Sequence, residues 1–157
     1  MNTSALDALL AAGEWKAADE ETRRLLLADA DEGGFIGLDP VEVPTLDCAL
    51  LLAIDHAWRE ASHGRYGFTA QGDILTAVRA EGYGPKKTWR VFGTRIGWRQ
   101  RGWLDASDLS YIADAQEGHL PWVPGTLPIV STGRTYEVLF LFYRLFDDCL
   151  TAHHEAR

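Results

Sequence analysis

The sequence predicts an all-α domain, and three features of the chain lead to that prediction. Apolar side chains recur at spacings of three and four residues in successive segments. No convincing run alternates apolar and polar residues, as a half-buried β-strand would. Glycine pairs and glycine–proline steps separate the periodic segments. We therefore expect six or seven helices with ordered loops, forming a single domain over residues 1–157.

The first half of the chain should form three helices. Ser4 is expected to cap a short helix that ends at Gly13, and a second helix should begin near Trp15 and stop at the Gly33-Gly34 pair. Residues 35–44 contain two prolines and no helical period, so they are expected to form an apolar loop. Thr45 is expected to cap a third helix, which Gly64 would end.

The second half should hold three more helices and a long irregular stretch. Thr69 is expected to cap a fourth helix that stops at residues 82–85, and a short fifth helix should carry Trp89 and Phe92. Residues 93–133 are rich in glycine, proline and aromatic side chains and should form short turns and loops. Thr135 is expected to open the last helix.

The two cysteines, Cys48 and Cys149, lie far apart in helix-like sequence. Without a CxxC pair or a secretory context we expect free buried thiols, with a disulfide as the alternative. The N-terminus has neither the basic nor the apolar region of a signal peptide, and no apolar run approaches the ~20 residues of a membrane span. The expected location is therefore the cytoplasm.

Charge and tryptophan are concentrated in the same part of the chain. Residues 61–104 carry eight basic and two acidic side chains, whereas the whole chain has a net charge of −8. Five of the six tryptophans fall between Trp58 and Trp122. Stacking faces beside guanidinium groups suit a flat conjugated ligand with acidic edges, and the alternative is a tryptophan-rich core. The acidic remainder opposes a nucleic acid partner, because such proteins are usually basic over a whole face.

Catalytic and metal-binding patterns are missing from the sequence. His56 has no second ligand one helical turn away, and His153-His154 lie in the C-terminal tail. There is no GxSxG elbow, P-loop or GxGxxG stretch. We expect no enzyme activity, no catalytic residue and no bound metal.

Five motifs in order resemble one family. They are the stretch from Gly13 to Thr22, the Ile54-Asp55 step with Trp58, the stretch SHGRYGFTAQ over 62–71, GWRQRGW over 97–103, and GHLP over 118–121. In this order and spacing they resemble the genomes-uncoupled tetrapyrrole-binding family, the regulators of magnesium chelatase. The resemblance covers about residues 5–150.

The resemblance implies a helical cupped-hand core whose apolar palm holds a porphyrin between two loops, here 35–44 and about 97–122. Leu38, Val41 and Val43 would form one wall, with rings from the motif aromatics and arginines for the propionates. His119 and Leu120 belong to the GHLP turn, where His119 either braces the turn or ligates a metal. The full set of expected ligand-binding residues is Leu38, Val41, Val43, Tyr66, Phe68, Trp98, Arg99, Arg101, Trp103, His119, Leu120, Trp122 and Arg134.

Two functions follow from the resemblance. The first is a carrier or regulator with no intrinsic cofactor, which binds protoporphyrin IX or Mg-protoporphyrin IX and stimulates the large porphyrin-binding subunit of magnesium chelatase. The second is a sensor or interaction module of the same fold that binds haem, a bilin or a protein partner. Ala106 stands where some relatives carry a further aromatic, which thins the expected lid.

Overall fold

The computed structural model describes residues 2–29, 43–123 and 134–156, and these form six α-helices and two short 3-10 turns, with no β-strand among them. The fold is therefore all-α, as predicted. The elements are α1 (Ser4–Ala11), α2 (Trp15–Asp29), η1 (Val43–Thr45), α3 (Cys48–Ser62), α4 (Phe68–Arg79), α5 (Pro85–Arg95), η2 (Ala106–Asp108) and α6 (Arg134–Glu155).

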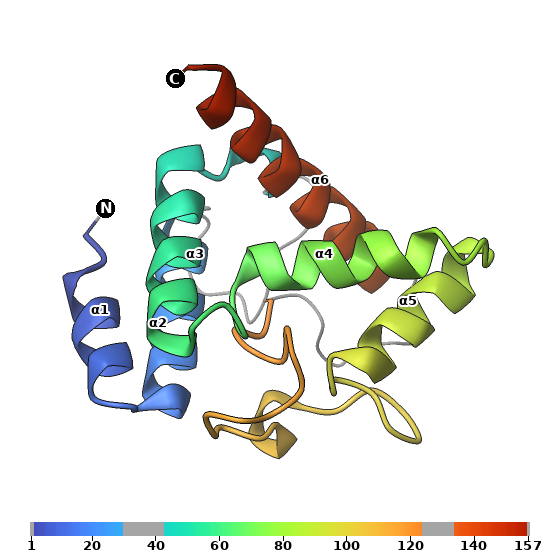
Figure 1. The fold of residues 1–157 in the computed structure, drawn as a ribbon, viewed down its shortest axis with the longest axis horizontal. Coiled ribbons are helices and arrows are strands. Elements are labelled where there is room, and N and C mark those ends of the chain that lie inside the picture. The colour runs from blue at the N-terminus through green and yellow to red at the C-terminus, as the bar shows by residue number, and fades with distance from the viewer. Residues whose placement is uncertain (1, 30–42, 124–133, 157) are drawn as a thin grey trace.

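The helices pack as two groups that α4 and α6 connect. Helices α1, α2 and α3 lie together on one side of the molecule, and α5 lies on the other (Figure 1). Helix α4 contacts α3, α5 and α6, while α6 also contacts α3 and η1. The irregular segment that follows α5 runs beneath α4 (Figure 1). None of the helices within the described ranges is both long and apolar enough to cross a bilayer.

Aromatic rings form much of the core. Trp15, Trp58 and Tyr66 make one cluster with centroid distances of 5.5–6.2 Å, which joins α2 and α3 to the loop before α4. A second group joins α4, α5 and α6 through ring contacts among Phe68, Phe92, Trp98, Phe142, Tyr143 and Phe146. Edge-to-face ring pairs add to the area they bury, so a small domain gains stability from such a core.

The helix positions agree with the sequence, but three expected caps are wrong. Ser4 is the first residue of α1 rather than its cap; Thr3 takes the N-cap position without a side-chain cap bond, and the Ser4 amide donates to Asn2 Oδ1 at 2.8 Å. Asp47, not Thr45, caps α3, because its carboxylate accepts from the Leu50 amide at 3.2 Å. Helix α4 begins one residue before Thr69, whose amide donates to Asp55 at 2.8 Å. Several polar residues near each helix start compete for the cap, and tertiary contacts decide among them.

The expectation of two free thiols is wrong. Cys48 at the start of α3 and Cys149 in the last third of α6 form a disulfide with a Cα–Cα distance of 5.4 Å. Their sequence separation of 101 hides this proximity, since it arises only when α6 packs on α3. The bond therefore links the start of α3 to the C-terminal helix.

Candidate functional site

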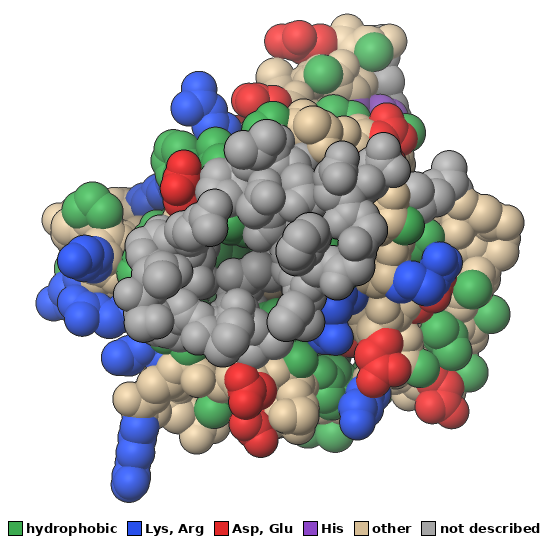
Figure 2. Space-filling model, turned by 180° about the vertical axis from the view of Figure 1, so that it is seen from behind, with side chains coloured by type: hydrophobic (Ala, Val, Ile, Leu, Met, Phe, Trp, Pro, Cys, Tyr) green, Lys and Arg blue, Asp and Glu red, His purple; other side chains and the backbone are tan. Residues whose placement is uncertain are grey.

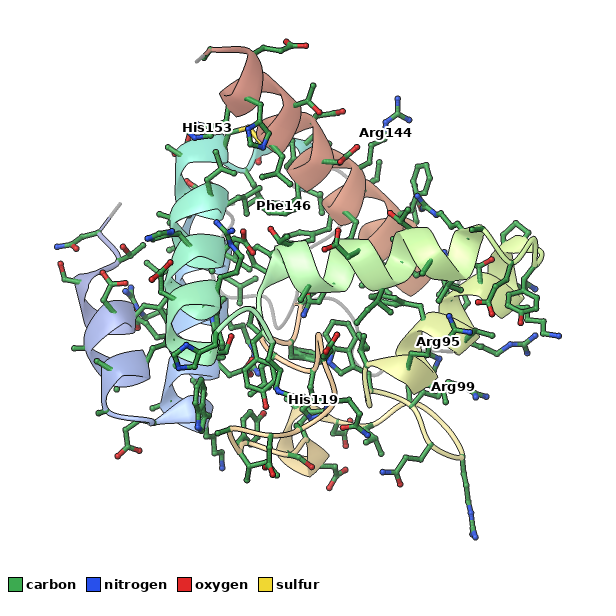
Figure 3. All side chains as sticks on the ribbon, viewed as in Figure 1. Arg95, Arg99, His119, Arg144, Phe146 and His153 are labelled. Atoms are coloured by element: carbon green, nitrogen blue, oxygen red, sulfur yellow. A yellow bond between two sulfur atoms is a disulfide. The ribbon has the colours of Figure 1, made fainter. Side chains whose placement is uncertain are left out.

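The outer face of α5 forms a surface hollow of about 530 Å³, which we call the basic hollow. It is lined by Lys87, Arg90, Val91, Thr94 and Arg95 of α5 and by Arg99 from the turn that follows. Figure 3 shows Arg95 and Arg99 near each other at the C-terminal end of this helix. The hollow is wide open to solvent, so it is a surface depression rather than an enclosed pocket.

Residue spacing on α5 places the cations on one side. Lys87, Val91 and Arg95 are four residues apart, so they share a face of the helix. Trp89, Phe92 and Gly93 are buried on the opposite face. Pro85 occupies the first turn, where its missing N–H costs no hydrogen bond. The local sequence thus forms an amphipathic helix whose polar face is basic.

The turn after α5 brings Arg99 back to the helix. Gly97 has φ of +81°, and a Cβ there would lie 2.7 Å from His119 Nδ1 and from the Gln116 side chain. The amides of Trp98 and Arg99 both donate to the Gly93 carbonyl, at 2.8 and 3.1 Å. An isolated bridge then pairs Arg99 with Trp103. This folded turn adds a guanidinium from a loop to those of the helix.

Trp103 is a half-buried ring that packs on α5 outside the lining of the basic hollow. A Cβ added to Gly93 would lie 2.5 Å from two carbons of the Trp103 ring, so the indole rests directly on α5. The Tyr136 ring of α6 lies 6.1 Å away between centroids. Gly93 therefore makes room for an aromatic side chain that a larger residue would displace.

Three of the four cations in the hollow have no carboxylate partner among the described residues. Arg95 pairs with Glu81 at 2.6 Å, and Lys87 lies 4.7 Å from the Tyr83 ring centroid. No carboxylate within the described ranges pairs with Arg90 or Arg99. Their guanidinium groups can therefore bind carboxylates of a ligand, with paired N–H groups that match carboxylate geometry.

The structure divides the thirteen expected site residues into three groups. Arg99 lines the basic hollow, Trp103 is joined to Arg99 by a backbone bridge but does not line the hollow, and Arg101 is exposed and does not line it either. Val43, Tyr66, Phe68, Trp98, His119, Leu120 and Trp122 are buried, with at most 2% of each exposed. Leu38, Val41 and the side chain of Arg134 lie outside the described residues.

The SHGRYGFTAQ motif supports the fold through hydrogen bonds to Asp55 and through one close backbone approach at Gly67. The Asp55 carboxylate accepts from the Thr69 amide and hydroxyl at 2.8 and 2.7 Å and pairs with Arg59 at 3.0 Å. Gly67 has φ of +114°, and a Cβ there would lie 2.8 Å from an Asp55 oxygen. Only glycine fits between the helix and this carboxylate.

Gln71 and Tyr143 hold the GHLP turn against α4 and α6. The Gln71 amide nitrogen donates to the carbonyls of Gly118 and Pro121 at 3.0 and 2.7 Å, and its oxygen accepts from the Tyr143 hydroxyl at 2.8 Å. The Gln71 amide nitrogen and oxygen and the Tyr143 hydroxyl are all buried. Each hydrogen bond therefore avoids the cost of leaving a buried polar atom without a partner. The motif glutamine therefore positions a loop.

His119 braces the same turn through both ring nitrogens. Nδ1 lies 2.7 Å from the Ile96 carbonyl and so carries the proton, and Nε2 accepts from the Ser110 amide at 2.9 Å. Burial lowers the pKa of His119 below its usual value. With both nitrogens engaged, the ring offers no lone pair to a metal in this conformation. Of the two expected roles, the structure shows the brace.

Asp19 connects α2 to the residue after the GHLP turn. Its carboxylate accepts from the Trp122 amide at 2.7 Å and pairs with Arg23 at 3.3 Å, and the Arg23 guanidinium lies 4.9 Å from the Trp122 ring centroid. Burial raises the pKa of Asp19 to about 6, although the Trp122 amide and Arg23 act in the opposite direction. A buried acid thus fixes the position of Trp122.

The sequence analysis missed Lys87, Arg90, Val91 and Arg95 as candidate site residues. A signal was present, because these residues repeat at helical spacing inside the only basic part of the chain. The hollow offers cations and an adjoining aromatic ring, a combination suited to binding an acidic ligand. Within the described residues, no group of three His, Cys, Asp or Glu side chains is placed to hold a metal ion.

The fold and the hollow together describe a class of protein, a helical domain with a ligand-sized, anion-attracting site. The chain belongs to the GUN4-like family, whose model matches residues 1–132. It is 30% identical over 135 residues to the chloroplastic tetrapyrrole-binding protein of Arabidopsis thaliana, and the match covers 80% of this chain. The chain spans about half of that relative, 47% of its length.

Two solved structures share the fold. Ligand-free GUN4 of A. thaliana superposes with a TM-score of 0.70 at 26% identity, covering 93% of this chain and 98% of that one. GUN4 of Chlamydomonas reinhardtii gives a TM-score of 0.70 at 23% identity, covering 94% of this chain and 89% of that one. The second likeness concerns the fold alone.

Proposed function

We propose that this chain is a non-catalytic tetrapyrrole-binding protein whose basic hollow receives the carboxylates of the ligand. The observation that carries the proposal is the pair of guanidiniums without an acidic partner, Arg90 and Arg99, together with the half-buried Trp103, whose backbone is bridged to that of Arg99. Membership of the GUN4-like family and the similarity to the tetrapyrrole-binding protein of Arabidopsis support the same ligand class.

The ligand we favour is protoporphyrin IX or its magnesium form. Its ring would stack on Trp103, and its two propionates would pair with Arg90 and Arg99. Burying on the order of 300 Å² of apolar surface contributes about 7 kcal/mol before association entropy is subtracted. That subtraction removes several kcal/mol, so we expect micromolar or somewhat tighter affinity.

The biological role we propose is to deliver the porphyrin to the large porphyrin-binding subunit of magnesium chelatase and to stimulate that enzyme. A binding protein suits this role because the ligand's carboxylates are held near the surface, from which they are readily transferred. Stimulation of purified chelatase by the wild-type chain, and not by a variant that fails to bind porphyrin, tests this step.

The binding step is tested by titrating the protein with protoporphyrin IX while following the Soret band and tryptophan fluorescence. An Arg90→Gln/Arg99→Gln double variant should bind at least about tenfold more weakly, a loss of about 1.4 kcal/mol. Arg24→Gln, which removes an exposed cation on α2, is the matched control. Equal affinity of all three proteins would remove the basic hollow from the site. Parallel titrations with haem and a bilin determine which tetrapyrrole is preferred.

A further inference from the structure

The outward face of α6 carries a regular row of exposed side chains, which we call the α6 stripe. It consists of Glu137, Phe140, Arg144, Asp147, Thr151 and His154, all exposed and spaced alternately by three and four residues. Such spacing keeps side chains on one seam of a helix. The opposite face of α6 is buried in the core, where Phe142 and Phe146 contact Phe68. Figure 3 shows Arg144 pointing away from the molecule and Phe146 pointing into it.

Phe140 is an unusual member of this row. It is 41% exposed, and Ile112 is the only other large apolar side chain this exposed among the described residues. Beside it, α4 and α6 enclose a groove of about 220 Å³ whose wall includes Leu75, Tyr143 and Leu150. An exposed aromatic next to a groove of mixed apolar and charged lining is an arrangement that a partner surface of matching charge would cover.

The groove has an acidic end and a basic end. Phe68 at the start of α4 contacts Phe146, so Asp73 and Asp147 lie toward that end. The Arg79 guanidinium lies 5.7 Å from the Phe140 ring centroid, which places Arg79 toward the other end, with Arg144 one turn from Phe140. No ion pair among the described residues neutralises Asp73, Asp147 or Arg144.

The α6 stripe is complementary to itself when two copies of α6 run antiparallel. Residues equally distant from the midpoint between Leu145 and Phe146 then face each other. Arg144 meets Asp147 of the second copy, Phe140 meets Thr151 beside the apolar Leu150, and Glu137 meets His154. In a parallel arrangement Arg144 would face Arg144 and Asp147 would face Asp147, which repels.

We propose that two copies of this chain pair through their α6 stripes in an antiparallel, twofold-symmetric contact. Twofold symmetry repeats each pair, so the Arg144–Asp147 attraction and the Phe140 contact each occur twice. The acidic end of the groove in each copy then lies opposite the basic end of the groove in the other copy. A helix from a different protein would need to reproduce this alternation of charges, whereas a second copy supplies it.

The test is a charge exchange measured by sedimentation velocity over a range of protein concentrations, without tetrapyrrole. The wild-type chain should show a reversible monomer–dimer equilibrium. Arg144→Asp and Asp147→Arg should each weaken the dimer by at least about tenfold, because each creates two like-charge contacts. The double variant Arg144→Asp/Asp147→Arg should recover most of that loss, since the pairs are restored with opposite sign.

Far-ultraviolet circular dichroism and melting curves of each variant control for folding, which exposed substitutions should leave intact. Arg24→Gln serves as the matched surface control on α2. A wild-type monomer at every concentration would overturn the proposal, and so would a dimer that either reversal leaves unchanged or that the double variant fails to restore. A stripe that binds a partner of another kind would give the first of these results, because the sample contains only this chain.

Discussion

Two buried tryptophans, Trp58 and Trp98, each combine a large apolar side chain with one hydrogen bond from the indole N–H. The Trp58 indole N–H donates to the Thr22 hydroxyl at 2.9 Å, and the Trp98 indole N–H donates to the His119 carbonyl at 2.7 Å. A leucine at either position would pack but would leave the buried acceptor without a donor. Tryptophan thus fixes the relative position of two elements, which explains why aromatics replace aliphatics here.

Trp103 and Phe68 illustrate a distinction between ligand contact and core packing. Trp103→Ala should weaken porphyrin binding by about 1–3 kcal/mol while the fold persists, because the ring is only half-buried and its neighbour across the backbone bridge, Arg99, lines the hollow. Phe68→Ala should instead lower the free energy of unfolding by about 3–5 kcal/mol, because its ring is fully buried. Fluorescence titration and urea denaturation of both variants separate these effects. A Trp103→Ala protein with unchanged affinity would contradict this assignment.

The buried Asp19 should make stability depend on pH in a defined direction. Because its pKa is raised to about 6 in the folded protein, the folded state binds a proton more tightly than the unfolded state. The charged form therefore destabilises the fold at neutral pH, and protonation between about pH 6 and 4 relieves that cost. Relative to Asp19→Asn, the wild type should gain at most about 3 kcal/mol between pH 7 and pH 4.

Denaturant unfolding of both proteins at several pH values measures this gain. Using Asp19→Asn as the reference cancels the contribution of His119, whose lowered pKa acts in the other direction. A constant difference between the two proteins across this pH range would show that Asp19 titrates normally.

At the scale of the helix, substitution by alanine should change stability in opposite directions at two glycines that both lie inside helices, Gly72 and Gly93. Gly72 in α4 has nothing within 4 Å of an added Cβ, so Gly72→Ala should stabilise the protein by about 0.5–1 kcal/mol. Gly93→Ala should destabilise it by about 1–3 kcal/mol, because the new methyl displaces the Trp103 ring. Thermal and urea unfolding compare the two, and a change of the same sign in both would argue against the packing described for α5.

Helices were predictable because their apolar spacing is local information, and α2 through α6 all contain the residues expected of them. Their first turns were less predictable. The Asp55 carboxylate accepts from the Thr69 amide in α4, fourteen positions further along the chain, and no local sequence pattern predicts this contact. The same holds for the motif residues. Composition marked Gly67 and Gln71 as unusual, but only tertiary contacts show that they support turns rather than touch a ligand.

Across the whole molecule, the disulfide should be a major source of stability. Closing a loop of about 100 residues contributes about 4–5 kcal/mol in the chain-entropy description. Reduction with a dithiol should lower the free energy of unfolding by about 4–5 kcal/mol. The double variant Cys48→Ser/Cys149→Ser should show the same loss. Urea denaturation with and without reductant measures it, with Cys48→Ser/Cys149→Ser as the reductant-insensitive control. Equal stability under both conditions would mean that the bond contributes no constraint.

At the scale of the whole molecule, the distribution of charge along the chain could be predicted from the sequence. The shape of the basic surface could not. The basic character of residues 61–104 is plain from counting, but the hollow arises only when Arg99 folds back on α5. Figure 2 shows the opposite face of the molecule, where Lys and Arg side chains gather along one edge while Asp and Glu side chains are scattered. A local basic site on a chain with net charge −8 attracts a small anion at short range only.

The most direct test of the central claim compares protoporphyrin IX with its dimethyl ester in matched titrations of the wild-type protein. Both ligands have the same macrocycle, but only the free acid offers carboxylates to Arg90 and Arg99. We expect saturable one-to-one binding of the acid with a red-shifted Soret band, and an ester that binds about 1–2 kcal/mol more weakly. Equal affinities for acid and ester, or no saturable binding of either, would contradict a site built on the basic hollow.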